Sequence, residues 1–340
     1  IVLIFLCACL ISKIIISPRR IGEAAGRYRA ARAGQKMTRG MIDVAEGNFN
    51  RGERILAKSA TFSDSPLFNY LQAARAAHLQ GHNKRRDNWL KLAYQEVPEA
   101  ANAVLLTQAE FQLDQGNLED ALAALRRLDE NSKNHGHALA LMGRIYFQLE
   151  DWVSLESIFP RITKYSHISQ ETLASWISKI HSEKLKNANN VNDILKAWKN
   201  IPSPQKLNVT NQLAYYEALM RNNLHEKAEK EMASSIDSSW QPALVQLYGH
   251  VHGADINRQI TKAETWSRKH KNDPDILLTT ARLCLKNELW GKARHNLELL
   301  IELNPNSLAY ELYGDLLRKM GETDAAAKAY KDGLKKLKKN

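Results

Sequence analysis

The stretch QAEFQLDQGNLEDALAALRRL, residues 108–128, decides the fold class of this chain. The small residues Ala109 and Ala121 lie twelve positions apart, so two antiparallel helices can approach closely where they face each other. Gly116 stands between them and can end the first helix, because glycine adopts the left-handed conformation without penalty. Leucines then recur at helical spacing, at Leu118, Leu122 and Leu125. The stretch therefore predicts a helical hairpin.

The same arrangement recurs along the whole chain. The contact positions of successive first helices are spaced by 34, 35, 34, 34, 39, 33, 32 and 33 residues. These positions are Gly40, Ala74, Ala109, Gly143, Ile177, Tyr216, Gly249, Ala281 and Gly314. A period near 34 is typical of tetratricopeptide repeats, whose hairpins stack into a solenoid with a concave surface formed mostly by the first helices. We predict an all-α fold with about nine hairpins over residues 40–327, and a longer loop near 187–206, where the spacing is widest.

The first residues, IVLIFLCACLISKIIIS at 1–17, form an apolar segment. As a helix it would be about 25 Å long, slightly short of a hydrocarbon core of about 30 Å. We predict a transmembrane helix that the sequence enters part-way, because no initiating Met precedes it. A secretory signal peptide would carry its basic residues before the apolar run, whereas here they follow it. The positive-inside rule then predicts that everything downstream lies in the cytoplasm.

Most of the net charge of +11 lies at the two ends of the chain. A basic juxtamembrane segment, 18–39, has seven cations and one acid, and the last helix end and tail, 328–340, have six lysines and one acid. The predicted membrane-interface residues are Lys13, Arg19, Arg20, Arg27 and Arg29. The segment either lies along anionic lipid or serves only as a topology signal. The body between is nearly neutral, which argues against a nucleic-acid groove.

Motifs that carry chemistry are missing from the sequence. It has no GxGxxG or Walker glycine loop, no GxSxG elbow, no HExxH and no paired CxxC. Three cysteines, two of them in the apolar leader, make neither a disulfide framework nor a zinc pattern. We therefore expect no enzyme activity, no metal site and no resident cofactor.

Two features leave room for a ligand. His250 and His252 flank Val251 and, with Cys284, are candidates for binding haem or porphyrin, although half-exposed histidines near a helix end are also ordinary. The seven tryptophans could form a recognition cage, but packing within hairpins explains large aromatics at these positions more simply.

Exposed first-helix positions are the expected docking surface. One position after the contact residue, the sequence places the partner-binding candidates Arg75, Glu110, Arg144 and Arg282. A chaperone-type carboxylate clamp would require Lys and Asn there in successive repeats, so chaperone tails are not the expected ligands.

Several longer stretches resemble one family. They are AEGNFNRGERIL (45–56), LFNYLQAARAAHLQG (67–81), QAEFQLDQGNLEDALAALRRL (108–128), LEDWVSL (149–155) and DPDILLTTARLCLKNELWGKAR (273–294). The chain resembles the HemY proteins, inner-membrane tetratricopeptide proteins of proteobacteria associated with haem biosynthesis. The resemblance implies two N-terminal spans, a cytoplasmic repeat domain and a role in a late step of protohaem synthesis. We expect residues 1–17 to belong to one of those spans.

Three functions follow from these observations. The leading hypothesis is a membrane-anchored scaffold of the bacterial inner membrane that gathers late haem-biosynthesis enzymes by protein–protein interaction. The second is a tetratricopeptide adaptor for envelope quality control or lipopolysaccharide regulation, although the C-terminal metal knuckle common in such adaptors is replaced by LKKLKKN. The third is direct binding of haem or porphyrin.

Overall fold

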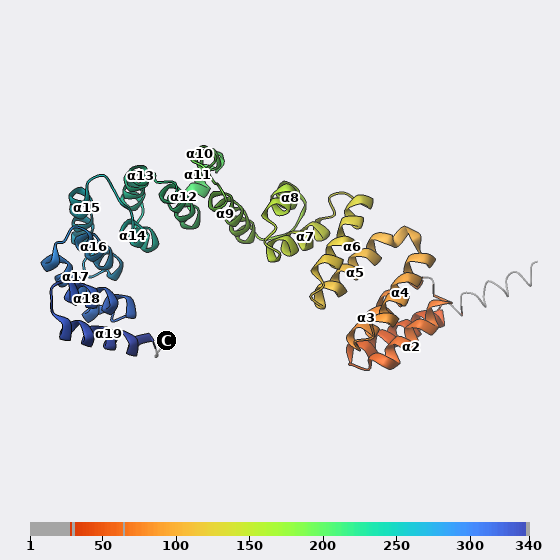
Figure 1. The fold of residues 1–340 in the computed structure, drawn as a ribbon. Helices are drawn as coiled ribbons and strands as arrows, with labels where there is room; N and C mark the ends of the chain where they lie inside the picture. Colours follow the sequence, from red (N-terminus) through yellow and green to blue (C-terminus); the bar gives the residue numbers. More distant parts are fainter. Residues whose placement is uncertain (1–27, 29–30, 64, 338–340) are drawn as a thin grey trace, which may run out of the picture. The chain divides into compact units, whose positions relative to one another are not determined.

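The computed structural model describes residues 28, 31–63 and 65–337, and its regular elements over these residues are all helices (Figure 1). The chain divides into two compact units, one ending at Ile168 and one beginning at Ser169. Most consecutive helices pair within each unit, so the predicted all-α array of tetratricopeptide-like hairpins is confirmed.

The first unit contains four hairpins. A helix over 31–45 pairs with α2 (Phe49–Ala60). The next helices are α3 (Pro66–Leu79), α4 (Asn83–Glu96), the short 3₁₀ helix η1 (Pro98–Ala100), α5 (Ala101–Asp114), α6 (Leu118–Asn131), α7 (Gly136–Gln148) and α8 (Trp152–Tyr165). Residues 31–39, part of the predicted basic segment, are helical and belong to the first hairpin.

The second unit contains five hairpins. Its helices are α9 (Gln170–Lys186), α10 (Val191–Asn200), α11 (Ser203–Lys206), α12 (Val209–Arg221), α13 (His225–Ser238), α14 (Pro242–Tyr248), α15 (Ile256–Lys269), α16 (Pro274–Lys286), α17 (Trp290–Leu303), α18 (Ser307–Lys319) and α19 (Thr323–Leu337). Numbered along the chain, the eighth and ninth hairpins are α16/α17 and α18/α19. α14 and α15 stand in the place of the seventh, although α14 packs mainly on α16, α12 and α13. Counted this way, the described residues contain nine successive helix pairs.

Small residues sit where the paired helices touch. Ala109 and Ala121 are completely buried between α5 and α6. At the same position of the ninth hairpin, a Cβ atom added to Gly314 would lie 2.5 Å from the ring of Tyr330. Gly116 has a φ of +76° and ends α5, as predicted. The contact positions found in the sequence therefore mark real helix–helix contacts.

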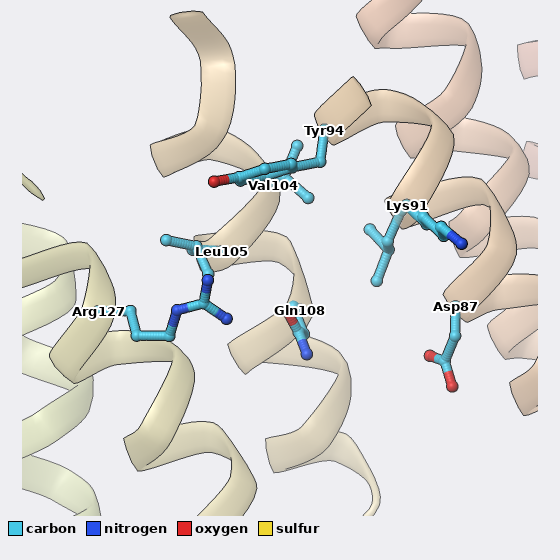
Figure 2. A pocket seen from close by; sticks show the side chains of 8 residues that line it. Asp87, Lys91, Tyr94, Val104, Leu105, Gln108 and Arg127 are labelled. Carbon is cyan, nitrogen blue, oxygen red and sulfur yellow. The ribbon is translucent and has the colours of Figure 1, made fainter. Parts of the chain in front are cut away.

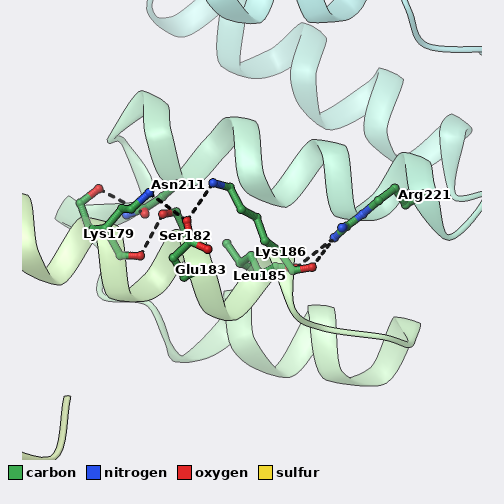
Figure 3. A network of polar contacts seen from close by, with 8 residues as sticks. Lys179, Ser182, Glu183, Leu185, Lys186, Asn211 and Arg221 are labelled. Atoms are coloured by element: carbon green, nitrogen blue, oxygen red, sulfur yellow. Dashed lines mark hydrogen bonds and ion pairs between the residues drawn. The ribbon is translucent and has the colours of Figure 1, made fainter. Parts of the chain in front are cut away.

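The residues between α9 and α12 are mostly helical, so the predicted longer loop is wrong. They form α10 and the one-turn helix α11, which begins with Ser203-Pro204 just after Pro202. Figure 3 shows a polar network between α9 and α12: Arg221 donates to the carbonyl of Lys186 at 2.9 Å, and Ser178 donates to Asn211 at 3.3 Å. These contacts close α9 onto α12 across the insertion.

Glu183 is the charged centre of the same network. Lys179 and Lys186 contact its carboxylate at 3.0 and 2.8 Å. Burial alone would raise the pKa of Glu183, but the hydrogen bonds from both lysines outweigh it and hold the pKa below its ordinary value. The network stays ionised near neutral pH and fixes the end of α9.

Trp266 and Trp198 pack in the hydrophobic core of the second unit. Trp266 is 2% exposed, packs edge-on against Tyr248, and donates its indole N–H to Asp237 at 2.8 Å. Trp198 stacks on Tyr215 with ring centroids 4.1 Å apart. Packing within hairpins accounts for these side chains.

Helices of the described region are too short or too polar to cross a bilayer. The predicted span, residues 1–17, and the predicted membrane-interface residues lie outside the described residues. Those residues are Lys13, Arg19, Arg20, Arg27 and Arg29.

Candidate functional site

The candidate site forms around a shortened helix in the second unit. α14 has seven residues, begins with Pro242 and ends at Tyr248, and the chain then runs irregularly to Asp255, which caps α15. Lys286, the last residue of α16, donates from Nζ to the carbonyls of Gly249 at 3.0 Å and Val251 at 3.3 Å. A neighbouring cation thus satisfies carbonyls that further helical turns would have used.

The segment after α14 projects two histidines. Val251 is completely buried, and its neighbours His250 and His252 are exposed. The backbone N–H of His252 donates to Nδ1 of His225, the first residue of α13, at 3.4 Å. The rings of His225 and His252 meet edge-on with centroids 5.2 Å apart. Burial of one apolar residue therefore orients both imidazoles outward.

Arg282 lies one helical turn before Lys286 on α16 and is half-buried. Among the described residues it forms no ion pair or hydrogen bond. Burial lowers the pKa of its guanidinium, and burial together with Arg282 lowers the pKa of Lys286. A half-buried cation without a partner favours an external anion.

Nearby positive charge also lowers the pKa values of both histidines, His250 and His252. Burial lowers the pKa of His250, and Arg282, Lys286 and His252 lower it further. Lys286 is the main cause of the lowered pKa of His252, followed by burial and His225. The two imidazoles are therefore mostly neutral at pH 7.

Five basic groups form what we call the basic cluster: His225, His250, His252, Arg282 and Lys286. The buried carboxylate of Glu229 lies close by but accepts hydrogen bonds from Tyr248 at 3.3 Å and Arg258 at 3.2 Å. The basic cluster can therefore accept a carboxylate or a phosphate, since Arg and Lys pair with such oxygens.

The structure joins two separate predictions from the sequence. Arg282 was expected to bind a protein and His250 and His252 to bind haem or porphyrin, and all three belong to the basic cluster. Cys284 was a third haem candidate, but it is completely buried and burial raises the pKa of its thiol to about 11. It cannot reach a ligand at this surface.

The other partner-binding candidates lie in the first unit. Arg75, Glu110 and Arg144 are exposed on α3, α5 and α7. Glu110 contacts His137 at 3.2 Å. They form a row of mixed charge on successive first helices and do not belong to the basic cluster.

Sequence reasoning missed two members of the basic cluster. Lys286 follows Arg282 by four residues, a spacing that places both on one helix face and could have revealed it. His225 comes from another hairpin, and nothing in the sequence relates it to His252.

The first unit also has a hollow of about 270 Å³ between α4, α5 and α6. Figure 2 shows Tyr94 and Leu105 beside it, with Lys91, Arg127 and Asp87 around the opening. Its lining mixes both charges with apolar groups, so it does not select one class of ligand. Over the described residues, no group of three or more His, Cys, Asp or Glu side chains is placed to hold a metal ion.

Comparison with known proteins gives matches to HemY proteins. A family model described as HemY protein N-terminus matches residues 1–81. Protein HemY of Escherichia coli is 24% identical over 320 residues, which cover 92% of this chain and 79% of that protein. This chain is similar to the HemY proteins over most of its length. The resemblance that the sequence stretches indicated is confirmed.

The solved structures that are similar to this chain share little sequence with it. A tetratricopeptide repeat protein from Parabacteroides merdae matches with a TM-score of 0.31 and 12% identity, covering 84% of this chain and 98% of that one. The crystal structure of the APC/C hetero-tetramer Cut9-Hcn1 matches with a TM-score of 0.34 and 11% identity, covering 87% of this chain and 64% of that one.

Proposed function

We propose that this chain is a membrane-anchored scaffold that organises enzymes of a late step of protohaem biosynthesis by protein–protein contact. Its repeat units face the bacterial cytoplasm, and it makes and breaks no bonds itself. The apolar leader and the cations after it support the anchor and its orientation. The similarity to the HemY proteins supports the haem pathway.

The observation that carries this proposal is the unpaired, half-buried Arg282 within the basic cluster. Lys286, the neighbouring cation on α16, and the neutral histidines after α14 leave this surface short of negative charge. An acidic segment of a client protein would supply it, because a carboxylate can accept hydrogen bonds from guanidinium and ammonium groups and from the N–H of neutral imidazoles. The client is thus a protein with an exposed acidic segment.

Scaffolding would act through local concentration. Two enzymes held on one membrane-anchored chain meet at effective concentrations that approach the millimolar range for short flexible connections. An intermediate leaving one enzyme then encounters the next before it diffuses away. This gain requires no catalytic group on the scaffold.

The experiment is capture from native membranes. A photoreactive residue is introduced into the full chain in place of Ala254, which is exposed next to the basic cluster. Cross-linked proteins are identified for the wild type, for Arg282→Glu and for the control Arg268→Glu, which reverses an exposed charge on α15. We expect late haem-biosynthesis enzymes to be enriched in the wild type and the control and lost from Arg282→Glu.

Two other outcomes decide against the proposal. Haem-pathway enzymes recovered no more strongly than from mock membranes would overturn it. Enrichment of envelope quality-control or lipopolysaccharide-regulating proteins in their place would favour the adaptor function.

A second candidate function is direct binding of haem or porphyrin. The observation that favours it is the neutral pair His250 and His252 beside Arg282 and Lys286, because imidazole can ligate iron and the cations can pair with propionate carboxylates. Haemin titrated into purified protein should give a saturable Soret shift that the His250→Ala/His252→Ala variant loses. A spectrum equal to that of free haemin would exclude this candidate.

A further inference from the structure

A separate group of cations surrounds a hollow in the first hairpin. The hollow has a volume of about 250 Å³ and lies between the helix over 31–45 and the end of α2. Arg32 and Lys36 line it from the first helix, and Lys58 and Phe62 line it from the second helix and the turn that follows. Arg32 and Lys36 are four residues apart, so they share one helix face.

The three cations are available to a ligand. Arg32, Lys36 and Lys58 are all exposed, and no carboxylate of the described residues forms an ion pair with them. Ser59, also in the lining, turns inward: its hydroxyl donates to the carbonyl of Leu56 and accepts from Asn69. The hollow thus presents positive charge over a floor whose polar groups are already satisfied.

Aromatic side chains accompany these cations. Phe62 is 55% exposed at the hollow, and Tyr28, four residues before Arg32, is 67% exposed. A large apolar ring held in water next to cations is typical of the boundary between lipid and water, where charge faces headgroups and the ring contacts acyl chains. A freely dissolved phosphate would make no use of Phe62.

We propose that this hollow binds the phosphate of an anionic phospholipid headgroup, with Phe62 contacting the acyl region. Arg32, Lys36 and Lys58 pair with the phosphate oxygens, as guanidinium and ammonium groups do in other anion sites. The proposed site combines Lys58 of α2 with Arg32 and Lys36 of the basic segment that precedes it. It does not depend on the client or on the haem pathway, so it stands or falls separately from the proposed function.

The test uses the purified full chain in detergent and dihexanoyl phosphatidylglycerol as the probe. Hydrogen–deuterium exchange locates binding, and titration gives the apparent affinity. We expect saturable protection of residues 31–45 and 55–62. The Arg32→Gln/Lys36→Gln/Lys58→Gln variant should weaken binding by at least about tenfold, since each cation near an anionic lipid contributes roughly fivefold.

The control variant Lys84→Gln/Lys91→Gln/Lys164→Gln removes the same charge from exposed positions of the same unit and should bind like the wild type. Phe62→Ser should weaken binding of the lipid without changing that of inorganic phosphate. Equal binding of the lipid by both triple variants would overturn the proposal, as would equal affinity for dihexanoyl phosphatidylcholine. Competition by inorganic phosphate at the same concentration as the lipid would show a free-anion site instead.

Discussion

The seventh and eighth hairpins follow one repeat scheme but begin with very different helices. α16 has 13 residues and closes with a tight turn, in which Glu288 has a φ of +55° and the N–H of Leu289 donates to the carbonyl of Cys284 at 2.9 Å. α14 has seven residues, and the chain then runs to Asp255 without a helix. The last residue of α16, Lys286, supplies hydrogen bonds that α14 lacks. A shortened helix can therefore be maintained by its neighbour, and the exposed segment becomes available for binding.

The two kinds of hairpin also differ in what holds them together. The regular hairpins depend on close contact at a small residue, such as Ala281 in the eighth and Gly314 in the ninth. The seventh depends on buried polar contacts through Glu229, which is 4% exposed. Substitutions that separate these two mechanisms sharpen the comparison.

The largest effect is expected for Glu229→Ala. The buried hydroxyl of Tyr248 would lose its acceptor and Arg258 its partner, so the free energy of unfolding should fall by about 2 to 3 kcal/mol. Urea denaturation followed by circular dichroism measures it. Glu298→Ala in the eighth hairpin is the control and should cost under about 1 kcal/mol, because its carboxylate is half exposed. Equal losses would contradict the distinction.

The next largest effect is expected for alanine at the contact position, which should destabilise the ninth hairpin more than the seventh. Gly314→Ala places a Cβ 2.5 Å from the ring of Tyr330, and we expect a loss of about 1 to 2 kcal/mol after the gain in helix propensity. Gly249→Ala meets atoms no closer than 3.4 Å and should stay within about 0.5 kcal/mol of the wild type. The measurement is thermal and urea unfolding of both variants. A larger loss for Gly249→Ala would show that the seventh hairpin also depends on a small residue.

A smaller effect is expected for Lys286→Met, which keeps most of the aliphatic stem but removes both hydrogen bonds to the carbonyls after α14. The free energy of unfolding should fall by about 1 kcal/mol, and amides of residues 249–253 should exchange faster. Removing this cation should also raise the pKa of His252, which NMR titration can follow. Lys271→Met, an exposed lysine before α16, is the matched control. Unchanged exchange would mean that the segment does not need Lys286.

The smallest effect is on the pH dependence of stability. An unfolded histidine titrates near pH 6.5, whereas His250 and His252 have lowered pKa values in the folded chain. Between these values the unfolded chain binds more protons, so stability falls as pH decreases from about 6.5 through the lower folded pKa values. Burial and the charges of Arg282, Lys286 and His252 lower the pKa of His250, and Lys286, burial and His225 lower that of His252.

The test compares urea midpoints from pH 7.5 to 5 for the wild type and for His250→Asn/His252→Asn. The variant should have the shallower pH slope, with His167→Asn, in the turn between α8 and α9, as a control. A slope as steep as that of the wild type would show that neither histidine is responsible.

Repeat spacing predicted the fold well because each hairpin obeys a local rule. Ala74, Ala109 and Ala281 mark contacts that any such hairpin must bury. The rule failed near 187–206, because a length excess says how many residues are added and not whether they form a helix. The candidate site was predicted only in part: Arg282 and the histidines were named separately.

By itself the sequence determined the all-α class and the period of the hairpins, because these depend on small residues and apolar positions at short spacing. Its longer stretches indicated the resemblance to the HemY proteins. The tertiary structure alone decided that α14 stops after seven residues, that Lys286 takes over its carbonyls and that His225, His250, His252 and Arg282 share one surface. The physical reason is that these groups come from three hairpins, and their electrostatic coupling depends on distances in space that spacing along the chain does not encode.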